Sequence, residues 1–248
     1  MTATTDHKCF TQPANKDERI WRYMGFAKFV SLIANRSLFF CRSDLLGDPF
    51  EGSFPQKSVE KRPEVYKKIG KDKVAYLVDA IPGMFKRQRL STYVNCWHMS
   101  PHESAAMWKL YSKSDEAIAV QSTYRRLLSV LPPKAFVGLV KYIDYEKETI
   151  DEWNTFSPFV YKRRSFEHER EVRGIIQDLP PKDNRGETGK EDPLCGKSIE
   201  VDLHHLIERV YVAPTSGPWY SNLVEEVVRK YGITQPVTRS SLDEQPIW

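Results

Sequence analysis

The sequence of 248 residues lacks the features that define several common protein classes. Its four cysteines are widely spaced and form no CxxC pair, so they indicate neither a zinc site nor a disulfide framework. They are Cys9, Cys41, Cys96 and Cys195. No stretch approaches the roughly 18 apolar residues of a membrane span, and the first residues contain no apolar signal segment. We therefore expect a protein of the cytoplasm with no membrane partner.

The chain also lacks the short motifs of the common nucleotide-binding and hydrolase folds. The patterns GxGxxG, GxxxxGK followed by Ser or Thr, HExxH and GxSxG do not occur, and no internal repeat is visible. Those motifs hold phosphates, zinc or a nucleophilic serine in well-known folds. Any chemistry must therefore come from less distinctive residues.

The residues that are present predict a folded globular protein. The composition is 40% hydrophobic and 28% charged, with 12 Phe, 12 Tyr and 6 Trp, which is rich in aromatics for a globular chain. The net charge of +4 is compatible with an anionic ligand or with nucleic acid but requires neither. A chain of this length can bury one large core.

The pattern along the chain predicts one mixed α/β (α+β) domain over residues 19–248. Residues 1–18 are polar and lack periodicity, so we expect a flexible leader. Residues 55–90 are rich in Lys and Arg and predict a basic helical insertion that covers a face of the core, with a break at Pro82-Gly83. Residues 178–197 combine Pro, Gly and charges, which is typical of an exposed loop.

Alternating and helical spacings place the remaining elements. The domain begins with a strand at 20–23, a helix at 26–33 and a strand at 37–42. We expect further strands at 92–99, 116–122, 135–145, 171–177, 198–203, 209–214 and 235–242, and helices at 100–112, 124–131, 204–208 and 218–232.

The segment SFEHEREVRGII, residues 165–176, is the most informative stretch of charge. In a strand Glu167, Glu169, Glu171 and Arg173 would share one face. Such a face must meet water, opposite charges or a ligand, because each unpaired buried charge costs several kcal/mol. In a helix Glu167 and Glu171 would be four residues apart and form a solvated stripe. Both interpretations stay open, and the apolar continuation favours the strand.

Other residues could bind a planar, anionic ligand. Arg22 could hold a phosphate with its guanidinium, and Tyr23 could stack on a ring or donate its hydroxyl. Trp97, Trp108 and Tyr111 could line a pocket for a ring. The alternatives are a surface arginine and ordinary core aromatics.

Two further groups could hold a metal. Asp44, Asp48 and Glu51 lie in and around a Gly-Asp-Pro turn, where a turn-forming role competes with a metal site. His98 and His102 are four residues apart but straddle Pro101, which spoils the helical geometry of a zinc site.

Three stretches together resemble a bacterial family defined only as domain of unknown function two thousand nine hundred and seventy-one. They are WRYMGFAKFVSLIANRSLFFCRSDLLGDPFEG, VNCWHMSPHESAAMWKLYS and FVYKRRSFEHEREVRGI. The resemblance covers roughly residues 19 to 240 and implies no activity.

The order of parts is also similar to the ADP-ribosyltransferase superfamily, although a Ser-Thr-Ser triplet is absent from the middle element. The resemblance implies a mixed, split β-sheet flanked by helices and NAD as substrate, with no metal. It implies that Arg22 holds NAD, that Tyr111 or Trp108 lies near the nicotinamide, and that Glu169 or Glu171 is the catalytic acid. Tyr23 and Arg173 are expected beside them as cofactor-binding residues.

We therefore expect an NAD-dependent ADP-ribosyltransferase or NAD glycohydrolase, acting as a phage-defence or toxin effector on a macromolecular acceptor. Two alternatives remain. One is a metal-dependent nuclease or phosphoesterase that uses Asp48, Glu51, Glu169 and Glu171. The other is a non-catalytic domain that binds nucleic acid or protein through the basic 57–90 segment.

Overall fold

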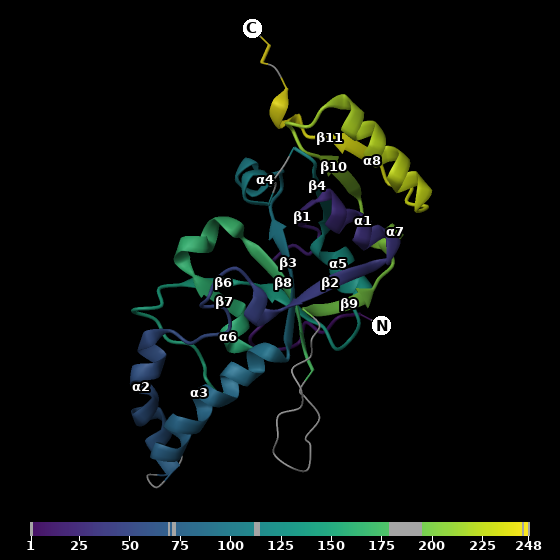
Figure 1. Cartoon of the computed structure of the whole chain (residues 1–248). Helices are drawn as coiled ribbons and strands as arrows, with labels where there is room; N and C mark the ends of the chain where they lie inside the picture. Colours follow the sequence, from purple (N-terminus) through teal and green to yellow (C-terminus); the bar gives the residue numbers. More distant parts are fainter. Residues whose placement is uncertain are drawn as a thin grey trace.

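A mixed β-sheet flanked by helices forms the body of the protein (Figure 1). A computed structural model describes residues 2–68, 70, 73–111, 115–178, 195–244 and 246–247. The large sheet contains β1 (Arg19–Gly25), β2 (Ser37–Arg42), β3 (Thr92–Met99), β4 (Ala117–Thr123), β5 (Phe136–Leu139), β8 (Glu171–Gln177), β9 (Gly196–Glu200), β10 (Arg209–Val212) and β11 (Val237–Arg239). Its main order is β11-β10-β4-β1-β3-β2-β9, and β8 pairs with β3 and β5.

The strand pairing confirms the expected mixed α/β class. β10 and β11 are parallel, whereas the other pairs of the large sheet are antiparallel. A second, parallel pair joins β6 (Lys141–Ile143) to β7 (Tyr161–Arg163). The expected long strand at 135–145 is therefore two short strands, β5 and β6, in different sheets.

The sheet is split beside β3. β8 pairs with β3 from Thr92 to His98, so β1 and β2 share the other edge of β3. β1 pairs there only at His98 and Met99, and β2 only at Tyr93 and Val94. Between these contacts, at residues 95–97 of β3, β1 and β2 diverge and leave a gap in the ladder.

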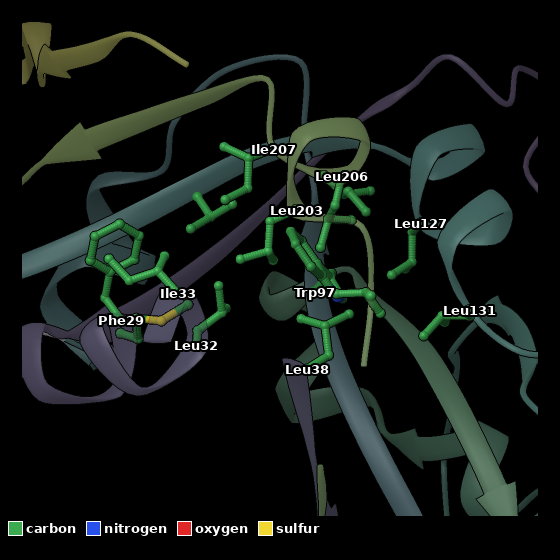
Figure 2. Packing of buried hydrophobic residues seen from close by; sticks show 14 of the residues in the cluster. Phe29, Leu32, Ile33, Leu38, Trp97, Leu127, Leu131, Leu203, Leu206 and Ile207 are labelled. Carbon is green, nitrogen blue, oxygen red and sulfur yellow. The ribbon is translucent and has the colours of Figure 1, made fainter. Parts of the chain in front are cut away.

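Helices cover the sheet because its strands are apolar on both faces. Ile20 and Met24 of β1 pack into the largest core, whereas Trp21 and Tyr23 pack into a smaller one. Figure 2 shows the large core, where Trp97 lies among side chains from several helices. The helices are α1 (Phe26–Ala34), α4 (Ala105–Tyr111), α5 (Tyr124–Val130), α6 (Ser157–Val160), α7 (Leu203–Leu206) and α8 (Pro218–Lys230). No helix in the described ranges is long and apolar enough to cross a bilayer.

The basic insertion is a helical hairpin of α2 (Gln56–Lys67) and α3 (Val74–Leu90). The expected break at Pro82-Gly83 is wrong, because α3 continues through both residues and the helices separate before Lys73. A small apolar cluster of its own, formed around Tyr66, Ile81 and Phe85, holds the hairpin together. It projects from the sheet and does not cover it (Figure 1).

The expected loose leader is packed on the domain over its described residues, 2–18. Thr4 and Thr11 form bridges to β5, and Phe10 is 3% exposed between Phe136 and Phe156. A Cβ at Gly138 would lie 2.9 Å from the Cβ of Phe10, so the close approach of the segment to β5 requires glycine. The expectation failed because the segment is held by distant partners and has no periodicity of its own. Residues 179–194 of the expected exposed loop lie outside the described residues.

We expect Phe10→Leu to lower the free energy of unfolding by about 1 kcal/mol, because the aromatic contacts in this cluster add roughly that amount to simple burial. Urea titration measures the change. Tyr76→Leu is the control, since Tyr76 is 72% exposed, and its titration should match the wild type. An unchanged Phe10→Leu midpoint would show that the segment contributes nothing to stability.

Candidate active site

A cavity of about 720 Å³ lies where the sheet splits. Its walls come from β1, α1, β2, β3, residues 45–51 and residues 162–173. Six of the seven residues singled out from the sequence line it: Arg22, Tyr23, Tyr111, Glu169, Glu171 and Arg173. The structure thus brings together residues from the first strand, the middle helix and the late strand.

Trp108 does not line the cavity. Its indole donates a hydrogen bond to Glu103 at 3.0 Å, and its ring packs edge-on against Tyr23 with the centroids 5.0 Å apart. The expected contact of Trp108 with nicotinamide is therefore wrong, because Tyr23 and Met107 lie on the cavity wall where Trp108 was expected. Trp108 supports Tyr23 from behind.

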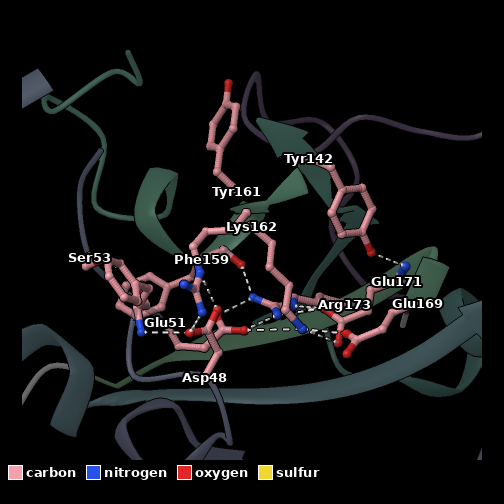
Figure 3. Close-up of polar contacts among 12 residues, drawn as sticks. Asp48, Glu51, Ser53, Tyr142, Phe159, Tyr161, Lys162, Glu169, Glu171 and Arg173 are labelled. Atoms are coloured by element: carbon pink, nitrogen blue, oxygen red, sulfur yellow. Dashed lines mark hydrogen bonds and ion pairs between the residues drawn. The ribbon is translucent and has the colours of Figure 1, made fainter. Parts of the chain in front are cut away.

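Buried charges form the floor of the cavity (Figure 3). Lys162 donates to Glu169 at 2.5 Å and lies 3.6 Å from Glu171 and 3.7 Å from Glu51. Arg173 joins Glu51 to Glu171. Three carboxyl groups therefore share two cations.

Arg173 holds this cluster in place. It is 1% exposed, and it donates four hydrogen bonds of 2.5–2.9 Å to Glu51, Glu171 and the carbonyl of Phe159. Its Nη2 also lies 2.6 Å from Glu171. Arg173 lines the cavity as expected, but its expected role as a direct ligand of the cofactor is corrected. Its guanidinium is committed to the carboxylates and positions them.

The pKa values of Glu169 and Glu171 are shifted in opposite directions. Burial and the nearby charge of Glu171 raise the pKa of Glu169, despite the bond from Lys162. Burial also opposes ionisation of Glu171, but the charges of Arg173 and Lys162 lower its pKa overall. Two hydrogen-bonded carboxyl groups whose pKa values are pushed apart can divide the tasks of proton carrier and fixed charge.

A turn, and not a continuous strand, brings these two glutamates together. Residues Arg164–Glu169 form a 3-10 helix, and β8 begins at Glu171. Arg170 between them has φ 40°, in the left-handed region, which costs energy for a residue with a side chain. Such strain is found where the surroundings hold a functional geometry. The strand expected at 171–177 is therefore confirmed, but the favoured extension of that strand back through Glu167 and Glu169 is wrong.

Arg22 lies at the split with part of its guanidinium unsatisfied. Its Nη2 donates to the carbonyl of Phe39 at 3.2 Å, while Nη1 is buried and has no partner among the described residues. Burial lowers the pKa of Arg22 to about 10, so the side chain remains charged near neutral pH. Arg22 as a whole is only partly buried, but a charge withdrawn from water without a counter-ion is costly, and an anionic ligand would relieve that cost.

Two tyrosines complete the wall. The hydroxyl of Tyr23 accepts a hydrogen bond from the backbone N–H of Ser104 at 2.8 Å. Tyr111 ends α4 and is 43% exposed. Partial burial, together with the charge of Glu169, raises the pKa of the Tyr111 hydroxyl. Both rings are neutral near pH 7 and can pack against an aromatic ligand.

The carboxylates proposed for a metal are already paired with cations. Arg163 donates to Asp48 at 2.7 Å, and Arg173 and Lys162 hold the other three. No group of three or more His, Cys, Asp or Glu in the described ranges has the spacing to hold a metal ion. A metal at this cluster would have to displace buried cations, so the geometry favours chemistry of the carboxylates themselves.

Two further residues that line the cavity are Lys162, which was not predicted from the sequence, and His98, which was considered only as a zinc ligand. Lys162 lies next to Arg163 and Arg164 in a basic run, and nothing in that run distinguishes the buried lysine from its neighbours. His98 and Cys96 are two residues apart on β3 and so lie on the same face of the strand. A strand pattern alone does not show which strand lies beside a cavity.

Comparison with known proteins adds no relative: no family model, no curated protein and no solved structure matches this chain.

Proposed function

We propose that the protein cleaves the bond between nicotinamide and ribose in NAD and transfers ADP-ribose to water or to a macromolecule. One observation carries the proposal. The unsatisfied cation Arg22 and the carboxyl pair Glu169 and Glu171 line the same cavity. NAD combines a pyrophosphate anion with a glycosidic bond whose cleavage develops positive charge. The cavity offers groups complementary to both.

The proposed reaction needs a negative charge beside the ribose. Nicotinamide leaves with the electron pair of the glycosidic bond, and the ribose carbon acquires oxocarbenium character, as in sugar hydrolysis. Glu171, held ionised by Arg173 and Lys162, supplies a fixed charge to stabilise that centre. Glu169, whose pKa is raised, is suited to take the proton of the attacking hydroxyl.

The shape of the cavity supports a ligand of this size. Its volume of about 720 Å³ falls within the 300–1,000 Å³ of typical ligand sites. Phe39, Trp97 and Tyr111 supply apolar and aromatic walls, which can cover a ring and exclude water. The resemblance to ADP-ribosyltransferases agrees with this assignment and suggests an effector that consumes cytoplasmic NAD as a toxin or in phage defence.

The first test incubates the purified protein with NAD, alone and with cell extract, and measures released nicotinamide by chromatography. We expect release, and we also expect NAD to raise the melting temperature. EDTA should leave the rate unchanged, whereas a metal-dependent nuclease or phosphoesterase would lose activity. If NAD neither shifts melting nor yields nicotinamide under either condition, the proposal is wrong.

Arg22→Ala should raise the KM for NAD about tenfold or more, because a desolvated charge-assisted contact with phosphate contributes roughly 1.5–3 kcal/mol. Steady-state kinetics and calorimetric titration measure the change. Arg19→Ala is the matched control, since Arg19 is an exposed residue of the same strand that does not line the cavity. An equal effect of both substitutions would show that Arg22 does not contact the ligand.

A further inference from the structure

His98 on β3, like Arg22, has a buried nitrogen atom without a hydrogen-bond partner among the described residues. The side chain is 3% exposed and lines the cavity. Its Nδ1 lies 2.7 Å from the carbonyl oxygen of Glu169, and its Nε2 is buried with no partner among the described residues. Buried polar atoms in native proteins almost always have a partner, and exceptions need an explanation.

Two residues of the cavity have a buried polar atom without a partner in the described part of the chain. Five buried side-chain nitrogen or oxygen atoms in the described part of the chain lack a partner, and two of them belong to cavity residues, Arg22 and His98. The Arg22 atom is a donor, so an anion would satisfy it. The character of the His98 atom depends on the position of the imidazole proton.

The contact with Glu169 sets that position. A carbonyl oxygen only accepts hydrogen bonds, so Nδ1 carries the proton and donates it. Burial lowers the pKa of His98, which favours the neutral ring. Nε2 therefore presents a lone pair and can serve only as an acceptor. A ligand that satisfies it must offer an N–H or O–H group.

His98 also lies at the reacting end of the site. It stands opposite Glu171 in the β3–β8 register, and its ring is bonded to the backbone of Glu169. If these glutamates face the ribose next to nicotinamide, the group within reach of His98 is the nicotinamide itself. Its carboxamide carries N–H groups, and one of them can donate the hydrogen bond that Nε2 does not receive from the described part of the protein.

We propose that His98 Nε2 accepts a hydrogen bond from the nicotinamide carboxamide and thereby selects NAD over its carboxylate analogue. This inference rests on the proposed NAD reaction. In nicotinic acid adenine dinucleotide a carboxylate replaces the amide, so two acceptors would face each other without a proton. A site built around a substrate N–H discriminates strongly against an analogue that lacks it.

The test uses NAD, nicotinic acid adenine dinucleotide and ADP-ribose as probes, with dissociation constants from calorimetric titration. The wild type should bind NAD at least about tenfold more tightly than the carboxylate analogue, as expected for a lost buried hydrogen bond. His98→Asn keeps a group at the δ position for the Glu169 carbonyl but none at the ε position. In this variant the two dinucleotides should bind equally well, within about twofold.

Two controls separate specificity from a structural role. His98→Gln places an acceptor near the ε position and should restore part of the preference for NAD. ADP-ribose lacks nicotinamide, so its affinity should be the same in wild type and variants. A preference that persists in His98→Asn, or a wild type without preference, overturns the inference while NAD binding itself stands. If the wild type binds neither NAD nor ADP-ribose, the proposed function fails and this inference fails with it.

Discussion

Glu169→Gln should slow nicotinamide release by about 100-fold or more while NAD still binds. The substitution keeps the shape of the side chain but removes its ability to exchange a proton, and a positioned acid or base typically contributes a factor of 100–10,000. It also removes one charge beside Lys162. Single-turnover kinetics at saturating NAD measures the effect on the chemical step.

Two neighbouring glutamates serve as comparisons. Glu167 is an exposed member of the same 3-10 turn, so Glu167→Gln should leave turnover and stability unchanged. Glu171→Gln should lower turnover and stability together, because Glu171 is also a partner of Arg173. If Glu169→Gln retains nearly full activity and Glu171→Gln abolishes it without unfolding, Glu171 performs the proton transfer assigned to Glu169.

Local patterns predicted the strands well because each strand carries its own signal. The aromatic run at 92–99 matches β3 over its full length, and short runs of apolar and aromatic residues identified β1 and β2. The packed N-terminal segment could not be predicted in the same way. Phe10 is buried by Phe136 and Phe156, more than 100 residues away, and its own neighbours are polar or small.

The site was predicted only in part, because the local sequence shows which residues are charged but not which distant residues they contact. Glu169 and Glu171 attracted attention because several charges had to avoid a dry core, and they do meet opposite charges. The identity of those charges depends on tertiary contacts. Glu51 and Arg173 are 122 residues apart, and each resembles an ordinary surface residue in its local sequence. The split that opens the cavity likewise depends on which strands pair with β3.

Residue spacing predicted the meeting of Glu169 and Glu171 but not the left-handed conformation of Arg170 between them. Alternation in a strand predicted that Glu169 and Glu171 share one face, and they do meet at one cluster, but the backbone reaches this arrangement through a 3-10 turn and Arg170. The apolar half of the segment formed the expected strand. The charged half formed a 3-10 helix instead, which places Glu169 beside the buried Lys162.

Arg173→Leu should lower the free energy of unfolding by about 3–5 kcal/mol, the usual result of removing one partner from a buried ion pair. The loss comes from Glu51 and Glu171, which remain buried without their shared cation. Urea titration at neutral pH gives the change in stability. Arg125→Leu is the control, since it breaks an exposed pair with Asp17, and exposed pairs contribute little.

A second substitution identifies the cause of this loss. Adding Glu51→Gln to Arg173→Leu removes one of the two unpaired carboxylates, so the double variant should be more stable than Arg173→Leu alone. A lost packing contact would instead add to the damage. If the double variant is less stable, Arg173 acts by packing and not by charge. If Arg173→Leu is no less stable than Arg125→Leu, the ion pairs of Arg173 contribute no more to folding than an exposed pair does.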